Sequence, residues 1–392
     1  MNRRFAAAAL GAFAFAASPA FAQQPVKIGL IMPYSGQFAD AATQMDNAVK
    51  LYVKEHGDTV AGRKIEFIRR DTGGVAPDVA KRHAQELVVR DNVDILAGFV
   101  LTPNAIAAAD VSSEAKKFMV VMNAATSIIT TKSPYLARTS LTTPQINESL
   151  GTWAAKKAGI RKTYTMVSDY GPGIDAEGAF QGGFKAAGGE IVGSVRIPVA
   201  NPDFFPFVQR AKDLNPEAIF VFVPGGAQPG AFGKALVNLG IDTKKTKVMG
   251  QGEITDENAL KVMGDAALGL ITAFHYDHDH KSAANAKFVG AYNGAYGRNP
   301  DFFSVGGWDG MHLIYESLKQ TGGKTDAELL ISAAKGMKWE SPRGPIAIDP
   351  ETRDIIQTVY IRRVEKVGGR LLNVEIDKIE NVKDPVKERM KK

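Results

Sequence analysis

Short runs of β-branched and aromatic residues alternate with longer amphipathic stretches along this chain, and this alternation constrains the fold more than any other feature. In the first half, the expected strands are Val26–Met32, Ile65–Ile68, Asp94–Ala97 and Phe118–Met122, and the expected helices are Ala39–Glu55, Asp78–Val89 and one opening at Pro103. Strands separated by helices of this length are typical of a parallel sheet with helices on both faces.

The pattern restarts after residue 160. The expected strands are then Thr163–Ser168, Ile191–Ile197, Ala218–Val223 and Lys247–Gly250, and the expected helices are Gly173–Ala187, Phe204–Leu214 and one ending at Gly240. A chain of 392 residues is also too long for one ordinary core. The sequence therefore predicts two successive doubly wound units of similar length.

The last third of the chain holds too few elements to enclose a core of its own. It contains expected strands at Leu270–Phe274 and Ile355–Val364, and expected helices near Asn285, Asp309 and Thr325. We expect these elements to complete the two earlier sheets, so the chain crosses between the units near Arg138–Ser140, His275 and Ser341–Pro345. The prediction is an α/β fold of two doubly wound, Rossmann-like lobes joined by a multi-strand hinge around a cleft. Lobe 1 comprises residues 25–139 plus 275–342, and lobe 2 comprises residues 140–274 plus 343–392.

The first 22 residues have the pattern of a secretory signal peptide. Arg3 and Arg4 precede an apolar run over Phe5–Ala17, and a small-residue cleavage motif ends at Ala22. A run of about thirteen apolar residues is too short to span a bilayer, which needs roughly twenty. We expect cleavage after Ala22 and export to the periplasm, without membrane insertion.

Composition and motifs argue against catalysis, cofactors and nucleic acid. The chain has no cysteine, which excludes thiolate chemistry, and it has no G-x-S-x-G, H-E-x-x-H or P-loop motif. The net charge of +6 is spread along the chain rather than gathered in a basic stripe, so no nucleic-acid partner is expected. The segment His275–His280 could hold a metal, but consecutive residues point in different directions, and we expect a polar connection there instead.

Two loops that follow predicted strands carry hydroxyl groups and small residues. Thr102 precedes a helix that opens with Pro103, and the second loop runs over Asn123–Ser127. In open α/β sheets ligands bind at the carboxyl ends of the strands, where helix N-termini favour anions. Each threonine by itself could be only a helix cap, but two such loops facing one cleft favour the binding of a carboxylate.

These loops belong to a longer series of motifs: Ile28–Gly36, Gly62–Glu66, Asp71, Pro77, Gly98, Asn123–Thr126, Asp169–Gly171 and Gly306–Asp309. In this order, over nearly the whole mature chain, they resemble the periplasmic leucine/isoleucine/valine-binding family, the type I solute-binding proteins of ABC importers. The resemblance implies that Thr102, Ala124 and Thr126 grip the ligand carboxylate and that Tyr170 closes over the ligand. Glu253 would pair with an α-ammonium group, and Tyr34, Leu101 and Ala125 complete the implied ligand-binding set.

The expected ligand is a hydrophobic, branched-chain amino acid, and the alternative is an aromatic carboxylate such as a hydroxybenzoate. The chain is also similar to an aromatic-acid-binding branch of the family, notably in Ser341–Pro345 and Gly307–Asp309. If Glu253 faces the cleft, its burial without a cation is costly and an amino acid is favoured. If Glu253 faces solvent, the aromatic acid is favoured.

The expected mechanism is closure of a hinge around the ligand, followed by docking of a monomer on the membrane permease of an ABC transporter. Two other classes stay open. The first is an exported hydrolase with an atypical site, for which Asp169 and Glu177 are a candidate pair. The second is a sensory receptor subunit that does not transport, which the same fold would serve.

Overall fold

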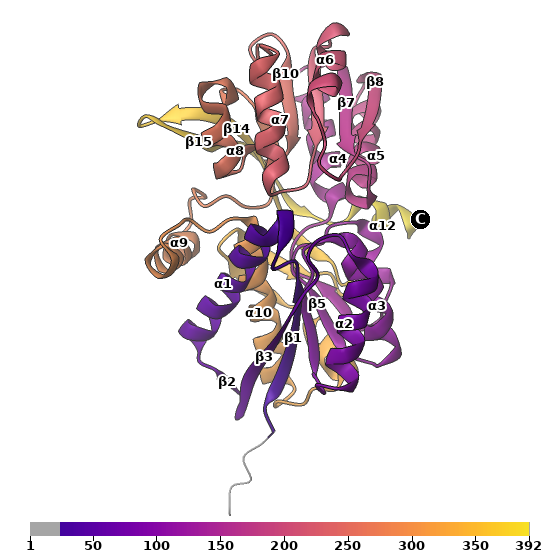
Figure 1. Ribbon diagram of the computed structural model, residues 1–392, viewed down its shortest axis with the longest axis vertical. Helices are drawn as coiled ribbons and strands as arrows, with labels where there is room; N and C mark the ends of the chain where they lie inside the picture. Colours follow the sequence, from indigo (N-terminus) through magenta and orange to yellow (C-terminus); the bar gives the residue numbers. More distant parts are fainter. Residues whose placement is uncertain (1–23, 392) are drawn as a thin grey trace, which may run out of the picture.

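The computed structural model describes residues 24–391 and shows two α/β units, one above the other (Figure 1). The first sheet has six strands in the order β2-β3-β1-β4-β5-β6, and all neighbours run parallel except β2 and β3. Its strands are β1 Val26–Met32, β2 Thr59–Val60, β3 Arg63–Asp71, β4 Ile95–Gly98, β5 Phe118–Val121 and β6 Leu136–Arg138. The signal peptide expected over residues 1–22 lies outside the described residues.

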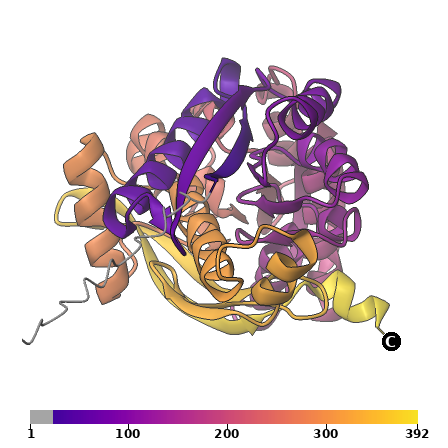
Figure 2. The ribbon, with the colours of Figure 1, turned by 90° about the horizontal axis from the view of Figure 1, so that it is seen from below.

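Helices cover both faces of the first sheet, as Figure 2 shows from below. They are α1 Ala39–His56, α2 Pro77–Val89, α3 Thr102–Glu114, α9 Ala283–Tyr296, α10 Phe302–Gln320 and α11 Ala327–Ala334. Alternate residues of β1 enter different cores, with Leu30 packed under α1 and α10 and Ile31 packed under α2 and α3. Helix α10 packs closely against the end of β5. Glycine at position 306 permits this, since a Cβ there would lie only 2.1 Å from the carbonyl oxygen of Met122.

The second sheet has nine strands. Its parallel part contains β7 Lys162–Ser168, β8 Glu190–Ile197, β9 Ala218–Phe222, β10 Lys247–Gln251 and β11 Ile271–Phe274. Its antiparallel part contains β12 Lys338–Ser341, β13 Gly344–Ile348, β14 Ile355–Val367 and β15 Arg370–Val382. The helices of this half and of the C-terminus are α4 Thr143–Lys156, α5 Gly171–Ala186, α6 Phe205–Asp213, α7 Ala227–Asn238, α8 Glu257–Met263 and α12 Pro385–Met390.

The structure confirms the predicted α/β class and the restart of the pattern, but it assigns the last third differently. Every strand of that part joins the second sheet, whereas the first sheet gains only helices α9 to α11. Strands β12, β13 and β15 were not predicted, and β14 runs three residues further than the strand expected to end at Val364. The predicted lobe boundary at residue 342 falls between β12 and β13, which pair with each other.

The chain passes between the two units after β6, after β11, and again between α11 and β12. The first passage is tied to the turn after β12 by Arg343, which is 1% exposed. Its Nη1 donates to the carbonyl oxygen of Ser140 at 2.6 Å, and its Nη2 lies 2.9 Å from a carboxylate oxygen of Asp309 in α10. Within residues 24–391 no helix is long and apolar enough to cross a membrane.

Candidate functional site

A cavity lies between the two lobes, at the carboxyl ends of strands from both sheets. The cavity is narrow, with a volume of about 40 Å³. Residues from both lobes line it: Phe38, Val100, Leu101, Thr102, Asn123, Ala125, Leu141, Tyr170, Pro172, Phe222, Pro224, Gly225, Gln251, Glu253, Phe302 and Phe303. This placement follows the general rule for ligands of open α/β sheets.

The lobe 1 side of the cavity is built from the start of α3 and the loop that follows β5. Thr102 is the first residue of α3, and its Oγ1 accepts a hydrogen bond from Oγ1 of Thr126 at 3.1 Å. Among the described residues, the backbone N–H groups of Thr102 and Ala125 have no hydrogen-bond acceptor. Free N–H groups beside the positive end of a helix dipole form a binding site for an anion.

Arg138 holds the loop after β5 from behind. Its Nη1 donates to the carbonyl oxygens of Ala124 at 3.1 Å and Thr126 at 2.8 Å, while Nε donates to Asp354 at 2.9 Å. The C=O and N–H of a trans peptide point in opposite directions. A carbonyl of Ala124 that faces Arg138 therefore turns the N–H of Ala125 away from Arg138.

The backbone before α3 is held in a strained conformation. Phe99, a buried residue that is not glycine, has φ of 64°. Its carbonyl oxygen accepts a hydrogen bond from the N–H of Ala124 at 2.9 Å, so the two loops are fixed to each other. Such outliers cost about 1–3 kcal/mol and concentrate at functional sites.

Helix α5 brings a second N-terminus to the same place from lobe 2. A Cβ at Gly171 would lie 3.1 Å from Oγ1 of Thr126 and 3.7 Å from Cγ2 of Thr102. One turn later, Oδ2 of Asp175 accepts a hydrogen bond from the N–H of Ser127 at 2.8 Å. The two lobes therefore touch across the cavity, and glycine at position 171 permits the close approach.

The C-terminal helix α12 contacts the same loop of lobe 1. Oδ2 of Asp384 accepts a hydrogen bond from Oγ of Ser127 at 2.6 Å, and Nζ of Lys387 donates to Asp354 and Thr130. Figure 1 places α12 at the level where the two units meet. Asp354 thus joins Lys387 to Arg138 under the anion-binding side of the cavity.

The lobe 2 side of the cavity holds a chain of three buried polar side chains. Nδ2 of Asn147 donates to Oε1 of Gln251 at 2.7 Å, and Nε2 of Gln251 donates to Oε1 of Glu253 at 2.8 Å. Glu253 is 6% exposed, and its Oε2 has no partner among the described residues. Burial raises the pKa of Glu253 to about 7, because desolvation penalises the charged carboxylate.

The structure brings most of the predicted site residues together. Leu101, Thr102, Ala125, Tyr170 and Glu253 line the cavity, and Thr126 contacts Thr102. Ala124 lies behind them, with its N–H bonded to Phe99 and its carbonyl oxygen bonded to Arg138.

Tyr34, Ala124 and Thr126 are not among the residues that line the cavity. Burial together with the nearby carboxylate of Asp46 raises the pKa of the Tyr34 hydroxyl.

Several site residues were missed by the sequence analysis: Phe38, Asn147, Phe222, Gln251, Phe302 and Phe303. One signal could have identified Phe222, because it ends strand β9 and so falls at the carboxyl edge of the sheet. Another points to Phe302, the first residue of α10, whose N-terminus is marked by the capping residue Asp301.

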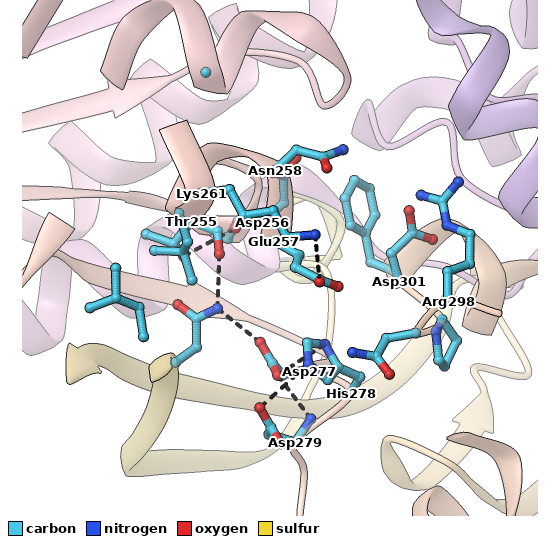
Figure 3. A pocket seen from close by; sticks show the side chains of 18 of the residues that line it. Thr255, Asp256, Glu257, Asn258, Lys261, Asp277, His278, Asp279, Arg298 and Asp301 are labelled. Atoms are coloured by element: carbon cyan, nitrogen blue, oxygen red, sulfur yellow. Dashed lines mark hydrogen bonds and ion pairs between the residues drawn. The ribbon is translucent and has the colours of Figure 1, made fainter. Parts of the chain in front are cut away.

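A wider, polar groove adjoins the cavity and is shown from close by in Figure 3. Asp277, His278 and Asp279 each contribute one possible metal-ligand atom, and these three atoms lie within 4.8 Å of one another. Asp277 already forms an ion pair with Arg362 at 3.0 Å and accepts a hydrogen bond from Asn373. The groove also holds Asp301, whose pKa is raised to about 7 by burial.

Two doubly wound sheets, a chain that passes repeatedly between them, and a cavity at the carboxyl ends of both sheets define the type I periplasmic-binding-protein fold. On one side of this cavity, backbone N–H groups of Thr102 and Ala125 have no acceptor among the described residues.

Residues 25–369 match the family described as "Periplasmic binding protein", and the chain belongs to that family. It is 44% identical over 387 residues to the Leu/Ile/Val-binding protein homolog 6 of Brucella abortus, with 98% of each chain covered. This membership confirms the prediction of a solute-binding component of an ABC transporter.

Two similar solved structures are solute-binding proteins of ABC transporters with aromatic acids bound. The protein from Rhodopseudomonas palustris BisB5, in complex with 3,4-dihydroxy benzoic acid, is 55% identical, with a TM-score of 0.89 over 93% of this chain and 99% of that one. The protein from Rhodopseudomonas palustris HaA2, in complex with p-hydroxybenzoic acid, is 42% identical, with a TM-score of 0.89 over 93% of this chain and 100% of that one.

Proposed function

We propose that this protein binds an aromatic carboxylate between its lobes and delivers it unaltered to the membrane permease of an ABC transporter. The observation that carries the proposal is the cavity itself, which has anion-binding N–H groups on one side and aromatic rings from both lobes around it. The aromatic residues are Phe38, Tyr170, Phe222, Phe302 and Phe303. Flat apolar walls of this kind suit a planar ring.

The ligand carboxylate is placed against the start of α3. The free N–H groups of Thr102 and Ala125 donate to its oxygens, and the helix dipole adds a favourable field. Hydrogen bonds to a charged group contribute roughly 1.5–3 kcal/mol each. Because the carboxylate is held mainly by backbone groups, this contact serves any ligand that carries a carboxylate and fits between the rings.

A branched-chain amino acid is the second candidate ligand. Glu253 faces the cavity, which is the arrangement expected for pairing with an α-ammonium group, and the Brucella abortus relative is named as a Leu/Ile/Val-binding homolog. However, a raised pKa and the hydrogen bond from Gln251 already reduce the cost of burying Glu253 without a cation. The aromatic lining and the 55% identical protein in complex with 3,4-dihydroxy benzoic acid favour the aromatic carboxylate.

In the proposed cycle, the protein acts in the periplasm as a monomer after cleavage following Ala22. Residues 25–139 plus 275–342 move against residues 140–274 plus 343–392, and the ligand stabilises the closed arrangement. The hydrogen bond between Ser127 and Asp175 joins these two parts across the cavity and supports closure at this point. A sensory receptor would bind the same ligand, and an uptake assay in a deletion strain distinguishes the two.

Isothermal titration calorimetry on residues 23–392, after removal of any bound ligand by unfolding and refolding, tests the proposal. We expect benzoate or 4-hydroxybenzoate to bind with Kd in the micromolar range or below, which corresponds to about 8 kcal/mol or more. Leucine and valine should give no heat, and the aromatic acid should be recovered unchanged by mass spectrometry. Tight binding of leucine without binding of any aromatic acid would overturn the proposal.

A further inference from the structure

Glu253 contains a buried carboxylate oxygen that the protein itself leaves without a partner. Its Oε1 accepts a hydrogen bond from Gln251, but its Oε2 has no donor among the described residues although the side chain is almost wholly buried. An acceptor that is removed from water without a partner costs free energy. Because Glu253 lines the cavity, a ligand bound there can supply that donor.

Asn147 determines which groups donate and which accept in the hydrogen-bonded chain Asn147–Gln251–Glu253. Asn147, in α4, is fully buried and donates through Nδ2 both to the carbonyl oxygen of Thr143 at 2.9 Å and to Oε1 of Gln251 at 2.7 Å. A carbonyl oxygen can only accept, so the amide group of Asn147 cannot be reversed. Gln251 must therefore present its NH₂ group to Glu253, and Glu253 must accept.

The nearest cation does not compete for the free oxygen. Arg362 is 2% exposed, and its guanidinium is already engaged. It forms an ion pair with Asp277 at 3.0 Å and donates to Oγ1 of Thr272 at 3.1 Å from both Nε and Nη2. The carboxylate of Glu253 is thus oriented by a neutral amide, and its Oε2 keeps no partner among the described residues.

We infer that Asn147, Gln251 and Glu253 make the site selective for aromatic carboxylates that carry a ring hydroxyl on the side away from the carboxylate, with Oε2 of Glu253 accepting the hydroxyl hydrogen. The inference rests on the proposed function and names the ligand subclass. Glu253 comes from lobe 2, whereas Thr102 and Ala125 come from lobe 1, so a ring held between them presents its two substituents to opposite walls. A hydrogen bond to a carboxylate is stronger than one between neutral groups.

The first experiment changes only the ligand. By calorimetry, wild-type protein should bind 4-hydroxybenzoate about 10- to 100-fold more tightly than benzoate, the range for one hydrogen bond to a charged group. 4-Fluorobenzoate and 4-methoxybenzoate carry a substituent without a donor and should bind no better than benzoate. If either binds as tightly as 4-hydroxybenzoate, shape rather than the donor is recognised and the inference is overturned.

The second experiment changes the acceptor. In Glu253→Gln the preference for 4-hydroxybenzoate over benzoate should fall to threefold or less. Glu257→Gln is the matched control, because it makes the same change in the same segment at an exposed side chain that does not line the cavity. This control should keep the wild-type preference.

The outcomes separate the inference from the proposed function. If Glu253→Gln loses both ligands equally, or if the wild type binds them equally, Glu253 does not recognise the hydroxyl although the protein still binds aromatic carboxylates. If the wild type binds neither ligand, the proposed function itself fails. The ligand series needs only wild-type protein, so it decides between these outcomes even where the Glu253→Gln variant does not fold.

Discussion

The two sides of the cavity present different chemical groups to a ligand: backbone groups on the lobe 1 side and side chains on the lobe 2 side. The lobe 1 side offers backbone N–H groups at Thr102 and Ala125, which helix geometry and Arg138 orient. The lobe 2 side offers side chains, Gln251 and Glu253, held by Asn147. Backbone donors persist through most substitutions, whereas a single substitution changes an acceptor side chain. The proposed carboxylate contact on the lobe 1 side is therefore less sensitive to substitution than the contacts on the lobe 2 side.

The largest expected effect follows from removing the ligand charge on the lobe 1 side. 4-Hydroxybenzamide keeps the ring and the hydroxyl of 4-hydroxybenzoate but presents an NH₂ group to the N–H donors. We expect its affinity to be lower by 100-fold or more, because charged hydrogen bonds are lost and a donor meets a donor. Calorimetry with the two ligands measures the difference. Equal affinities would show that the N–H groups of Thr102 and Ala125 do not hold the carboxylate.

Arg138→Lys should weaken every carboxylate ligand to a similar degree. Lysine cannot reproduce the fork that holds Asp354 and the carbonyl oxygens of Ala124 and Thr126, so the loop loses its fixed orientation. We expect Kd to rise by about 10- to 30-fold, because a hydrogen bond from a charged donor contributes roughly 1.5–3 kcal/mol. The ratio of the affinities for 4-hydroxybenzoate and benzoate is the internal control. A change in that ratio would mean that the two sides are not independent.

Acidification should change the affinities for 4-hydroxybenzoate and benzoate in different directions. The pKa of Glu253 is raised to about 7, and the titratable groups that face it are Tyr170, Asp256 and Arg362. A hydroxyl donor requires the ionised carboxylate, so the affinity for 4-hydroxybenzoate should fall about tenfold from pH 8 to pH 6. Benzoate has a C–H group in place of the hydroxyl and binds better when Glu253 is neutral. Its affinity should therefore stay constant or rise from pH 8 to pH 6.

Calorimetry at four pH values measures both slopes, and Glu253→Gln should remove them. Parallel slopes for the two ligands would assign the titration to a group outside the lobe 2 side.

The smallest expected effect is that of Thr102→Val. This change removes the hydroxyl that accepts from Thr126 but leaves the backbone N–H of the same residue in place. We expect a loss of about fivefold in affinity for both ligands, because one neutral hydrogen bond contributes about 1 kcal/mol. Thr102→Ser retains the hydroxyl and should bind like the wild type. A loss above 100-fold in Thr102→Val would place the side chain, rather than the backbone, at the centre of carboxylate recognition.

Much of the fold could be predicted from the sequence because buried strands have a local pattern. The strand expected at Val26–Met32 occurs with those bounds as β1, all of whose residues except Lys27 are buried. Strand β15, Arg370–Val382, was missed for the opposite reason, since it has no buried residue. It pairs with β14, and its Leu372, Val374 and Ile376 alternate with polar residues but are only half-buried. This alternation was overlooked in the sequence analysis.

Site residues could be predicted from the sequence only where following the end of a strand was enough to place a residue at the cavity. Thr102 and Tyr170 follow strand ends and do line the cavity. Tyr34 also follows a strand, but the rule does not say where a side chain points, and its ring packs on the core of lobe 1 instead. Asn147 and Gln251 are 104 residues apart and meet only in the folded chain, so no local motif could have identified them.

The seating of α12 beside the anion-binding loop has a practical consequence. Asp384 and Lys387 contact Ser127, Thr130 and Asp354, so helix α12 is fastened beside the proposed carboxylate subsite. A polyhistidine tag or a fluorescent reporter fused after Lys392 would be attached beside that subsite. Fusion upstream of Gln24 keeps the reporter away from it, because β1 begins at Val26 and its first residue belongs to the core of lobe 1.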